Sequence, residues 1–451
     1  MPYLQKAVSD PKAVISSQSA AHPIFHRSPC NTPLPLEIRT FCGSIILLAV
    51  ICAACECICY FLLHKGVPYA WPFIKFYDNV DIRCFIARFH YFHQLRFFSQ
   101  EPALEPVFAY PAPGAVLYRF FYLATHPIVF FFIVSLGLLS LLVATLYRAM
   151  RAEGVALRTA SIFLATAIVF SYPLWFEFLL GNLEIFIFLM IAAGVLAFLR
   201  GHCYTAATLF ALAGSIKIVP LIFLGLLVAR KQYRQFVFAI VLVTGVTLTS
   251  LWLVYPNIAV SCRGINTGLD LFRNSYLLHF RSEEVGFDHS IFGAIKQFTL
   301  TFADSATTAR VLSIYTKVAA SVGILLFFLR SRKLAVVNQI LCLTLAELLL
   351  PPTSIDYTLL TLYISWGLLI VICLQAARQG RRIPGLLWVF LCYAVLMSPE
   401  TEIIAAGQSY GGQMKCFILL VLMGLSLYFP FPSQFDSVCS SSVCIEPKIA
   451  Q

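Results

Sequence analysis

Long apolar runs follow one another along most of this 451-residue chain. A helix needs about 20 apolar residues to cross the hydrocarbon core of a bilayer, and helices satisfy their own backbone hydrogen bonds there. The pattern therefore predicts an all-α polytopic membrane protein. The clear expected spans are roughly 41–63, 127–147, 159–176, 183–199, 234–255, 310–329, 334–350, 357–374, 384–399 and 414–431.

One further apolar segment, residues 203–229, is too long for an ordinary span, and Lys217 and Pro220 interrupt it. Basic residues flank both of its ends, and Lys and Arg are retained on the cytoplasmic side of a membrane. The short basic loops all share that side only if the segment enters and leaves on the same face. We therefore predict a re-entrant hairpin that turns at Lys217, about 12 helical segments in all, and cytoplasmic termini. Broken helices of this kind mark functional sites.

Polar ends and two long loops complete the predicted organisation. Residues 1–40, rich in Pro and Ser, are expected to form a disordered cytoplasmic tail, and residues 432–451 a second one. The domain between them, 41–431, places its long loops 64–126 and 256–309 outside. Their aromatic-rich stretches suit helices that lie in the membrane interface. We expect a multi-pass protein of the plasma membrane with its active face outward.

The amino-acid composition also indicates a membrane protein and argues against a soluble domain. The chain is 60% hydrophobic and 12% charged, whereas soluble domains are about half apolar and a quarter charged. The net charge of +11 is explained by topology, and no nucleic-acid module is present. Four of the fifteen cysteines crowd the first span, at 52, 55, 57 and 59, where small apolar packing is a better explanation than a metal site.

Candidate chemistry rests on carboxylates. The chain lacks an Asp-x-Asp pair and a phosphate-binding Gly-rich loop, so we expect no metal or cofactor and a lipid monophosphate as leaving group. Asp78 and Asp81 in the first outer loop could serve as general base, or as ordinary solvated acids. Glu177, Glu184 and Glu347 lie near span ends, where helix capping or snorkelling to the interface is expected.

Several short motifs then occur in a recognisable order. They are Asp81 followed by Phe85, Tyr110-Pro111-Ala112-Pro113, Gly181-Asn182-Leu183, the stretch 213–220 ending in Lys-x-x-Pro, and Asp288-His289-Ser290-Ile291-Phe292-Gly293. In this order and on this topology the chain resembles the membrane-embedded GT-C glycosyltransferases over roughly 40–430. It is most similar to glycosyltransferase family 87, which includes polyprenyl-phosphomannose-dependent mannosyltransferases. Asp356 and Tyr357 stand where members of that family have a His.

The resemblance implies an inverting transfer of a hexose, often mannose, from a polyprenyl-phosphate sugar to a hydroxyl of a glycolipid or glycan. Asp81 would be the general base, with Asp78 supporting it. A basic group would stabilise the leaving phosphate. The candidates for that group are Lys217, Arg83, Arg88 and Arg273. The other candidate substrate ligands are Tyr110, Asn182, His289, Ser290, Asp356 and Tyr357.

Two alternative functions remain at this stage. A transporter or lipid flippase would also have broken helices and charges inside the membrane, and a structural subunit would need no chemistry at all. The large aromatic outer loops and the lack of an obvious internal repeat favour the glycosyltransferase.

Overall fold

Helices form nearly all of the chain in the computed structural model, which describes residues 33–63, 80–100, 108–279, 285–398, 404–405 and 408–432. Within these residues six helical segments are long and apolar enough to cross a membrane. The segments are built on α1 (Leu36–Leu63), α5 (Pro127–Ala152), α11 (Tyr233–Val254), α15 (Ser305–Leu329), α17 (Leu362–Arg378) and α19 (Gly411–Tyr428). The chain therefore forms an all-α polytopic membrane protein, as predicted.

Shorter apolar helices occupy the remaining predicted segments. α6 (Leu157–Val169) and α7 (Tyr172–Leu180) form one segment that bends by 58° at their junction. The others are α8 (Glu184–Leu199), α9 (Cys203–Ile216), the 3-10 helix η3 (Val219–Leu224), α10 (Gly225–Ala229), α16 (Val336–Leu349) and α18 (Leu386–Met397). Their lengths do not decide which of them cross a bilayer, so the count of twelve stays a prediction.

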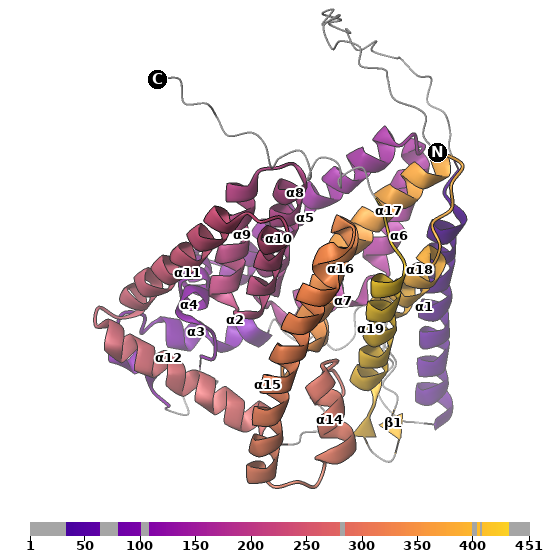
Figure 1. The fold of residues 1–451 in the computed structure, drawn as a ribbon. Coiled ribbons are helices and arrows are strands. Elements are labelled where there is room, and N and C mark those ends of the chain that lie inside the picture. The colour runs from indigo at the N-terminus through magenta and orange to yellow at the C-terminus, as the bar shows by residue number, and fades with distance from the viewer. Residues whose placement is uncertain are drawn as a thin grey trace, which may run out of the picture.

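The two long loops carry small helices. The first contains α2 (Val80–Cys84), α3 (Ile86–Phe89), the 3-10 helix η1 (Leu95–Phe98) and α4 (Ala112–Tyr122). The second contains α12 (Ile258–Phe272), the π-helix η4 (Arg273–Leu277) and α14 (Ile291–Thr299). In Figure 1, α12, α14 and β1 lie toward the end of the molecule at which α1 finishes.

Three short elements complete the described chain. The 3-10 turn η5 (Ser331–Lys333) joins α15 to α16, and η6 (Asp356–Thr361) leads into α17. Strands β1 (Ile404–Ala405) and β2 (Gln408–Ser409) pair antiparallel just before α19.

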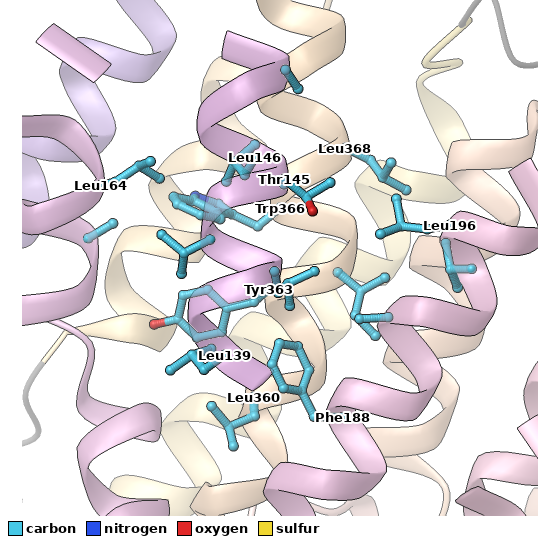
Figure 2. Close-up of a pocket in the computed structure, with 18 of the residues that line it drawn as sticks. Leu139, Thr145, Leu146, Leu164, Phe188, Leu196, Leu360, Tyr363, Trp366 and Leu368 are labelled. Atoms are coloured by element: carbon cyan, nitrogen blue, oxygen red, sulfur yellow. The ribbon is translucent and has the colours of Figure 1, made fainter. Parts of the chain in front are cut away.

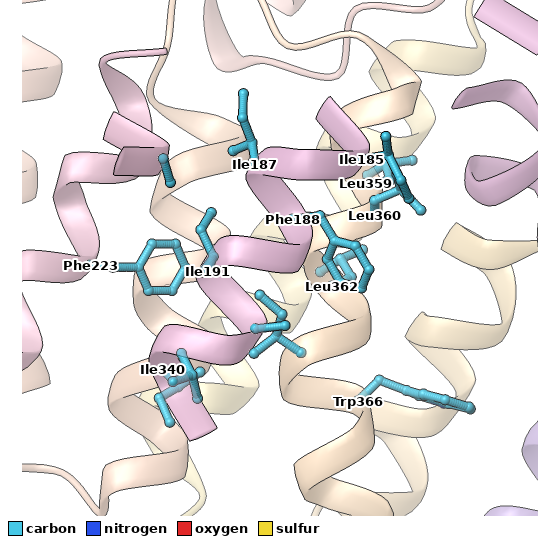
Figure 3. Close-up of a cluster of buried hydrophobic side chains, with 14 of the residues drawn as sticks. Ile185, Ile187, Phe188, Ile191, Phe223, Ile340, Leu359, Leu360, Leu362 and Trp366 are labelled. Carbon is cyan, nitrogen blue, oxygen red and sulfur yellow. The ribbon is translucent and has the colours of Figure 1, made fainter. Parts of the chain in front are cut away.

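Helix α8 forms the centre of the fold. It is buried along most of its length, as expected for a helix that is apolar on every side. α8 contacts α5, α9, η3 and η6, and Figure 3 shows Phe188 beside Leu362 and Ile191 facing Phe223. Its first residues are thereby held against η6, which carries two candidate site residues.

The helical backbone is interrupted between α9 and η3, which contact each other. Lys217 ends α9 in an extended conformation, and Pro220 lies in the first turn of η3. Gly214 permits η3 to pack closely on α9, because a Cβ there would lie 2.2 Å from Leu221 Cδ2. The break falls where the sequence predicts the tip of a hairpin, whereas re-entry into a membrane stays a prediction.

An apolar cavity of about 150 Å³ lies between α5, α6, α8 and α17. Figure 2 shows Leu139, Leu164, Phe188 and Trp366 around it. The hydroxyl of Tyr363, which also lines it, donates to Ser171 Oγ. A lining of this kind offers almost no hydrogen bonds to a sugar or a phosphate, so the polar site must lie elsewhere.

Candidate functional site

The corner between α7 and α8 brings together two predicted ligands from distant segments. Gly181 ends α7 in the left-handed conformation, with φ 64°. Asn182 then donates to the hydroxyl of Tyr110 at 2.8 Å, and its side-chain oxygen accepts the backbone N–H of Glu184 at 3.0 Å. Tyr110 and Asn182 therefore fix the position at which α8 begins.

Glu177 secures the same corner from α7. It is fully buried, and its Oε1 accepts the backbone N–H of Ile185 at 3.0 Å. The first N–H groups of a helix have no partner within the helix, so this is a capping interaction. Capping was one of the two roles expected from the sequence, and the other, snorkelling, is wrong for a side chain without exposed surface.

Lys217 forms an ion pair with Glu184. Its Nζ lies 2.8 Å from Glu184 Oε2, and the two side chains are 31% and 3% exposed. The same ammonium lies 5.6 Å from the ring centroid of Tyr357. An ammonium within an apolar segment is costly unless it is paired, and here a carboxylate of the chain itself is the partner.

Tyr357 belongs to a row of three stacked aromatic rings. Tyr357 stacks on Phe176 at 6.5 Å between centroids, and Phe176 stacks on Phe287 at 5.8 Å. Tyr357 and Phe287 are partly exposed. Together with Glu184, Lys217 and Glu347, these rings are called the open cluster below.

Glu347 on α16 completes the open cluster. Its side chain is only 5% exposed, and it interacts electrostatically with both Glu184 and Lys217. Burial again excludes the snorkelling that its place near a span end suggested. The sequence alone gave no reason to bring it to the pair of Glu184 and Lys217.

A second set of polar groups lies directly beside the open cluster, and its members Asp356, His289 and Lys415 are buried. The carboxylate of Asp356 lies 2.5 Å from Lys415 Nζ, 3.0 Å from the Tyr172 hydroxyl and 3.3 Å from His289 Nδ1. Asp356 and His289 have no exposed surface, and Lys415 is buried. These four residues are called the closed network.

The closed network also occupies the other ring nitrogen of His289. Its Nε2 lies 3.1 Å from Ser354 Oγ and 3.3 Å from Thr358 Oγ1. Both predicted ligands Asp356 and His289 are thus brought together, but inside the protein. Their contacts tie the second long loop to η6 and α19.

Asp288 and Ser290 organise the loop on either side of His289. Asp288 Oδ1 accepts the backbone N–H groups of Ser290 and Ser354, at 2.9 and 3.0 Å. Burial raises the pKa of the Asp288 carboxyl, and the two donors oppose that rise. Ser290 caps α14 by accepting the N–H of Gly293 at 2.8 Å. The geometry gives Ser290 a structural task.

Arg88 also belongs to the fold. It has no exposed surface, and its Nη1 donates to the backbone oxygens of Phe97 at 2.5 Å and Ser99 at 2.9 Å. A guanidinium held in this way fixes the loop that follows α3, so we withdraw Arg88 from the cations that could meet a carrier phosphate. Arg83 and Arg273 are exposed, on α2 and η4.

Of the two predicted catalytic residues, Asp81 falls at the start of α2. Asp78 lies outside the described residues, and for Asp81 the structure describes the backbone alone. α2 packs against α7, and α7 packs against η6. The backbone of Asp81 is therefore next to the helix that carries Phe176 and Glu177.

Apart from the rings of Phe176 and Phe287, four residues of these two groups were not predicted as ligands, namely Tyr172, Glu184, Glu347 and Lys415. The signal for three of them was a charge inside an apolar helix, which is costly unless the charge is paired or functional. Lys415 in particular lies within an expected span. Tyr172 offered no comparable signal.

Comparison with known proteins supplies the family. The sequence model of glycosyltransferase family 87 matches residues 108–399, well over half of the chain. The match includes the open cluster and begins after Asp81. Searches among the curated proteins and among the solved structures give no match. The chain therefore belongs to glycosyltransferase family 87 and is a membrane glycosyltransferase.

Proposed function

We propose that the protein transfers a hexose, mannose in the first instance, from a polyprenyl-phosphate sugar to an acceptor hydroxyl with inversion of configuration. Asp81 removes the proton of the acceptor hydroxyl, and the oxygen then attacks the anomeric carbon. The polyprenyl phosphate departs as a monophosphate. A GT-C fold, an active face on the outer side of the plasma membrane and an acceptor on a glycolipid or glycan belong to the same proposal.

One observation supports this assignment most directly. α2, which carries Asp81, packs against the helix whose Phe176 ring stacks on Tyr357, and Tyr357 lies against Lys217. Three distant parts of the chain thus supply a candidate base, an aromatic surface and a partly exposed cation. They are Asp81 on α2, the rings of Phe176 and Tyr357, and Lys217. Base, sugar platform and phosphate counter-charge are the three parts that such a transfer needs.

Lys217 is suited to the leaving phosphate. An ammonium has three donors, and Glu184 takes one of them. The Glu184 carboxylate also orients the Lys217 side chain. The other N–H groups of the ammonium are therefore held in place before the polyprenyl-phosphate sugar binds. Positive charge beside a departing phosphate stabilises the transition state more than the ground state.

The proposed base is tested by Asp81→Asn, which keeps the shape and removes the basic oxygen. Transfer from labelled polyprenyl-phosphate mannose should fall by about a hundredfold or more, while the protein still inserts and remains monodisperse in detergent. Asp78→Asn should cost much less. Asp270→Asn, an exposed carboxylate on α12, is the matched control and should leave transfer unchanged.

The same assay tests the stereochemistry. The anomeric signals of donor and product, recorded by NMR, should have opposite configurations. Retention of configuration, or near-native turnover by Asp81→Asn, would reject Asp81 as the base of an inverting transfer.

A further inference from the structure

Glu347 is a buried carboxylate whose hydrogen-bonding capacity is unused. Among the described residues neither of its oxygens has a hydrogen-bond donor. The Thr361 hydroxyl lies beside it but donates to the backbone oxygen of Thr358 at 3.0 Å. A buried carboxylate without donors is destabilising, so its retention in a packed helix calls for a ligand that supplies them.

The surroundings of Glu347 restrict the chemistry of that ligand. Glu184 lies close enough to repel negative charge at Glu347, and one donor of the nearby Lys217 ammonium is used by Glu184. A phosphate placed directly on Glu347 would meet two carboxylates. Neutral groups that donate hydrogen bonds meet no such repulsion.

The open cluster also offers a flat apolar surface. Tyr357, stacked on Phe176, is partly exposed and lies next to the ammonium of Lys217. A pyranose combines an apolar C–H face with neighbouring hydroxyls on its rim. A carboxylate accepts from two such hydroxyls at once, since it presents two oxygens.

We propose that Glu347, beside the pair of Glu184 and Lys217, forms a pyranose subsite in which its two oxygens accept hydrogen bonds from neighbouring sugar hydroxyls. The Tyr357 ring supports the C–H face of the sugar. This inference rests on the proposed function, because it places the subsite in the transfer site. The pyranose is either the hexose of the donor or a sugar of the acceptor.

The test combines Glu347→Gln with substrates that lack one hydroxyl. For the parent, one deoxy analogue of a short-chain polyprenyl-phosphate mannose should raise KM by about tenfold to a hundredfold, the effect of losing a hydrogen bond to a charged group. Glu347→Gln should raise KM for the complete sugar similarly and lose its sensitivity to that deletion. The same pattern with deoxy forms of a methyl mannoside acceptor would place the acceptor sugar there instead.

Stability separates this role from a structural one. Glu347→Gln replaces a buried carboxyl group whose oxygens have no donor among the described residues, so it should unfold at the same temperature as the parent or higher. The matched control is Glu153→Gln, whose carboxylate pairs with Arg378 at 2.7 Å outside both groups. It should leave both KM values and the deoxy pattern unchanged. If Glu347→Gln does not accumulate, Glu347→Asp enters the same comparison.

Every outcome decides the proposal. Equal KM values and equal deoxy sensitivity in parent and variant overturn it. If the parent transfers no hexose, the proposed function fails, and the subsite is then judged by the thermal shift that methyl mannoside, glucoside and galactoside produce. A shift in the parent that Glu347→Gln abolishes supports the subsite, whereas no shift, or the same shift in both proteins, overturns it.

Discussion

The open cluster and the closed network share η6, where Asp356 belongs to one and Tyr357 to the other, yet their polar groups are used differently. Asp356 is contacted by an ammonium, a phenol and an imidazole inside the protein. Glu347 has no such donors among the described residues, and Lys217 is partly exposed. A charged residue is therefore a ligand candidate only where the fold leaves some of its hydrogen-bonding groups without a partner inside the protein.

The largest expected effect comes from breaking the closed network. Lys415→Met leaves Asp356 buried without its cation and should lower the free energy of unfolding by about 3–5 kcal/mol. Denaturation in detergent, followed by circular dichroism, measures the loss. The double variant Lys415→Met with Asp356→Leu should regain most of it, because no unpaired charge remains.

If Lys415→Met unfolds like the parent and loses only transfer activity, the closed network takes part in the reaction. The contrast between the two groups would then be wrong. A loss of stability without a change in the KM values of the folded fraction would support the contrast between the two groups.

An intermediate effect is expected in the open cluster. Lys217→Gln should weaken binding of the polyprenyl-phosphate sugar and of free polyprenyl phosphate by about tenfold or more, the effect of one charge-assisted hydrogen bond. Acceptor affinity should change little. Lys217→Arg should recover part of the loss, since the charge remains although the geometry differs. Unchanged binding of polyprenyl phosphate by the Gln variant would remove Lys217 from the phosphate site.

The smallest effect is expected outside both groups. Arg378 and Glu153 are paired at 2.7 Å but partly exposed, and such pairs contribute about 0–1 kcal/mol. Arg378→Gln should therefore shift unfolding by less than about 1 kcal/mol and leave transfer unchanged. A larger change in either measurement would show that charge outside the two groups also matters.

The sequence predicted the helices better than their interruptions. The length of the apolar runs alone predicted α5 and α11, because a segment that crosses lipid must satisfy its backbone hydrogen bonds internally, as a helix does. The expected span 159–176 is in fact divided at Ser171, whose Oγ accepts the N–H of Leu174 and starts a new helix. A capping Ser followed by Pro173 was visible in the sequence, but an apolar window averages over it.

The site was harder to predict than the spans. Lys415 and Asp356 are 59 positions apart, and Lys217 and Glu184 are 33 apart. Their pairing depends on how far each helix is rotated about its axis, which hydropathy does not encode. For the same reason Glu347 resembled an interfacial acid until its neighbours were known.

Gly412 lets α19 pack closely against the loop that carries Asp288, because it has no side chain. A Cβ there would lie 2.5 Å from the backbone oxygen of Asp288, so even an alanine would push α19 away from the loop. Lys415 follows three positions later on the same face of that helix. An alanine at position 412 would therefore also move Lys415 away from Asp356, so an uncharged position controls the strength of the buried ion pair.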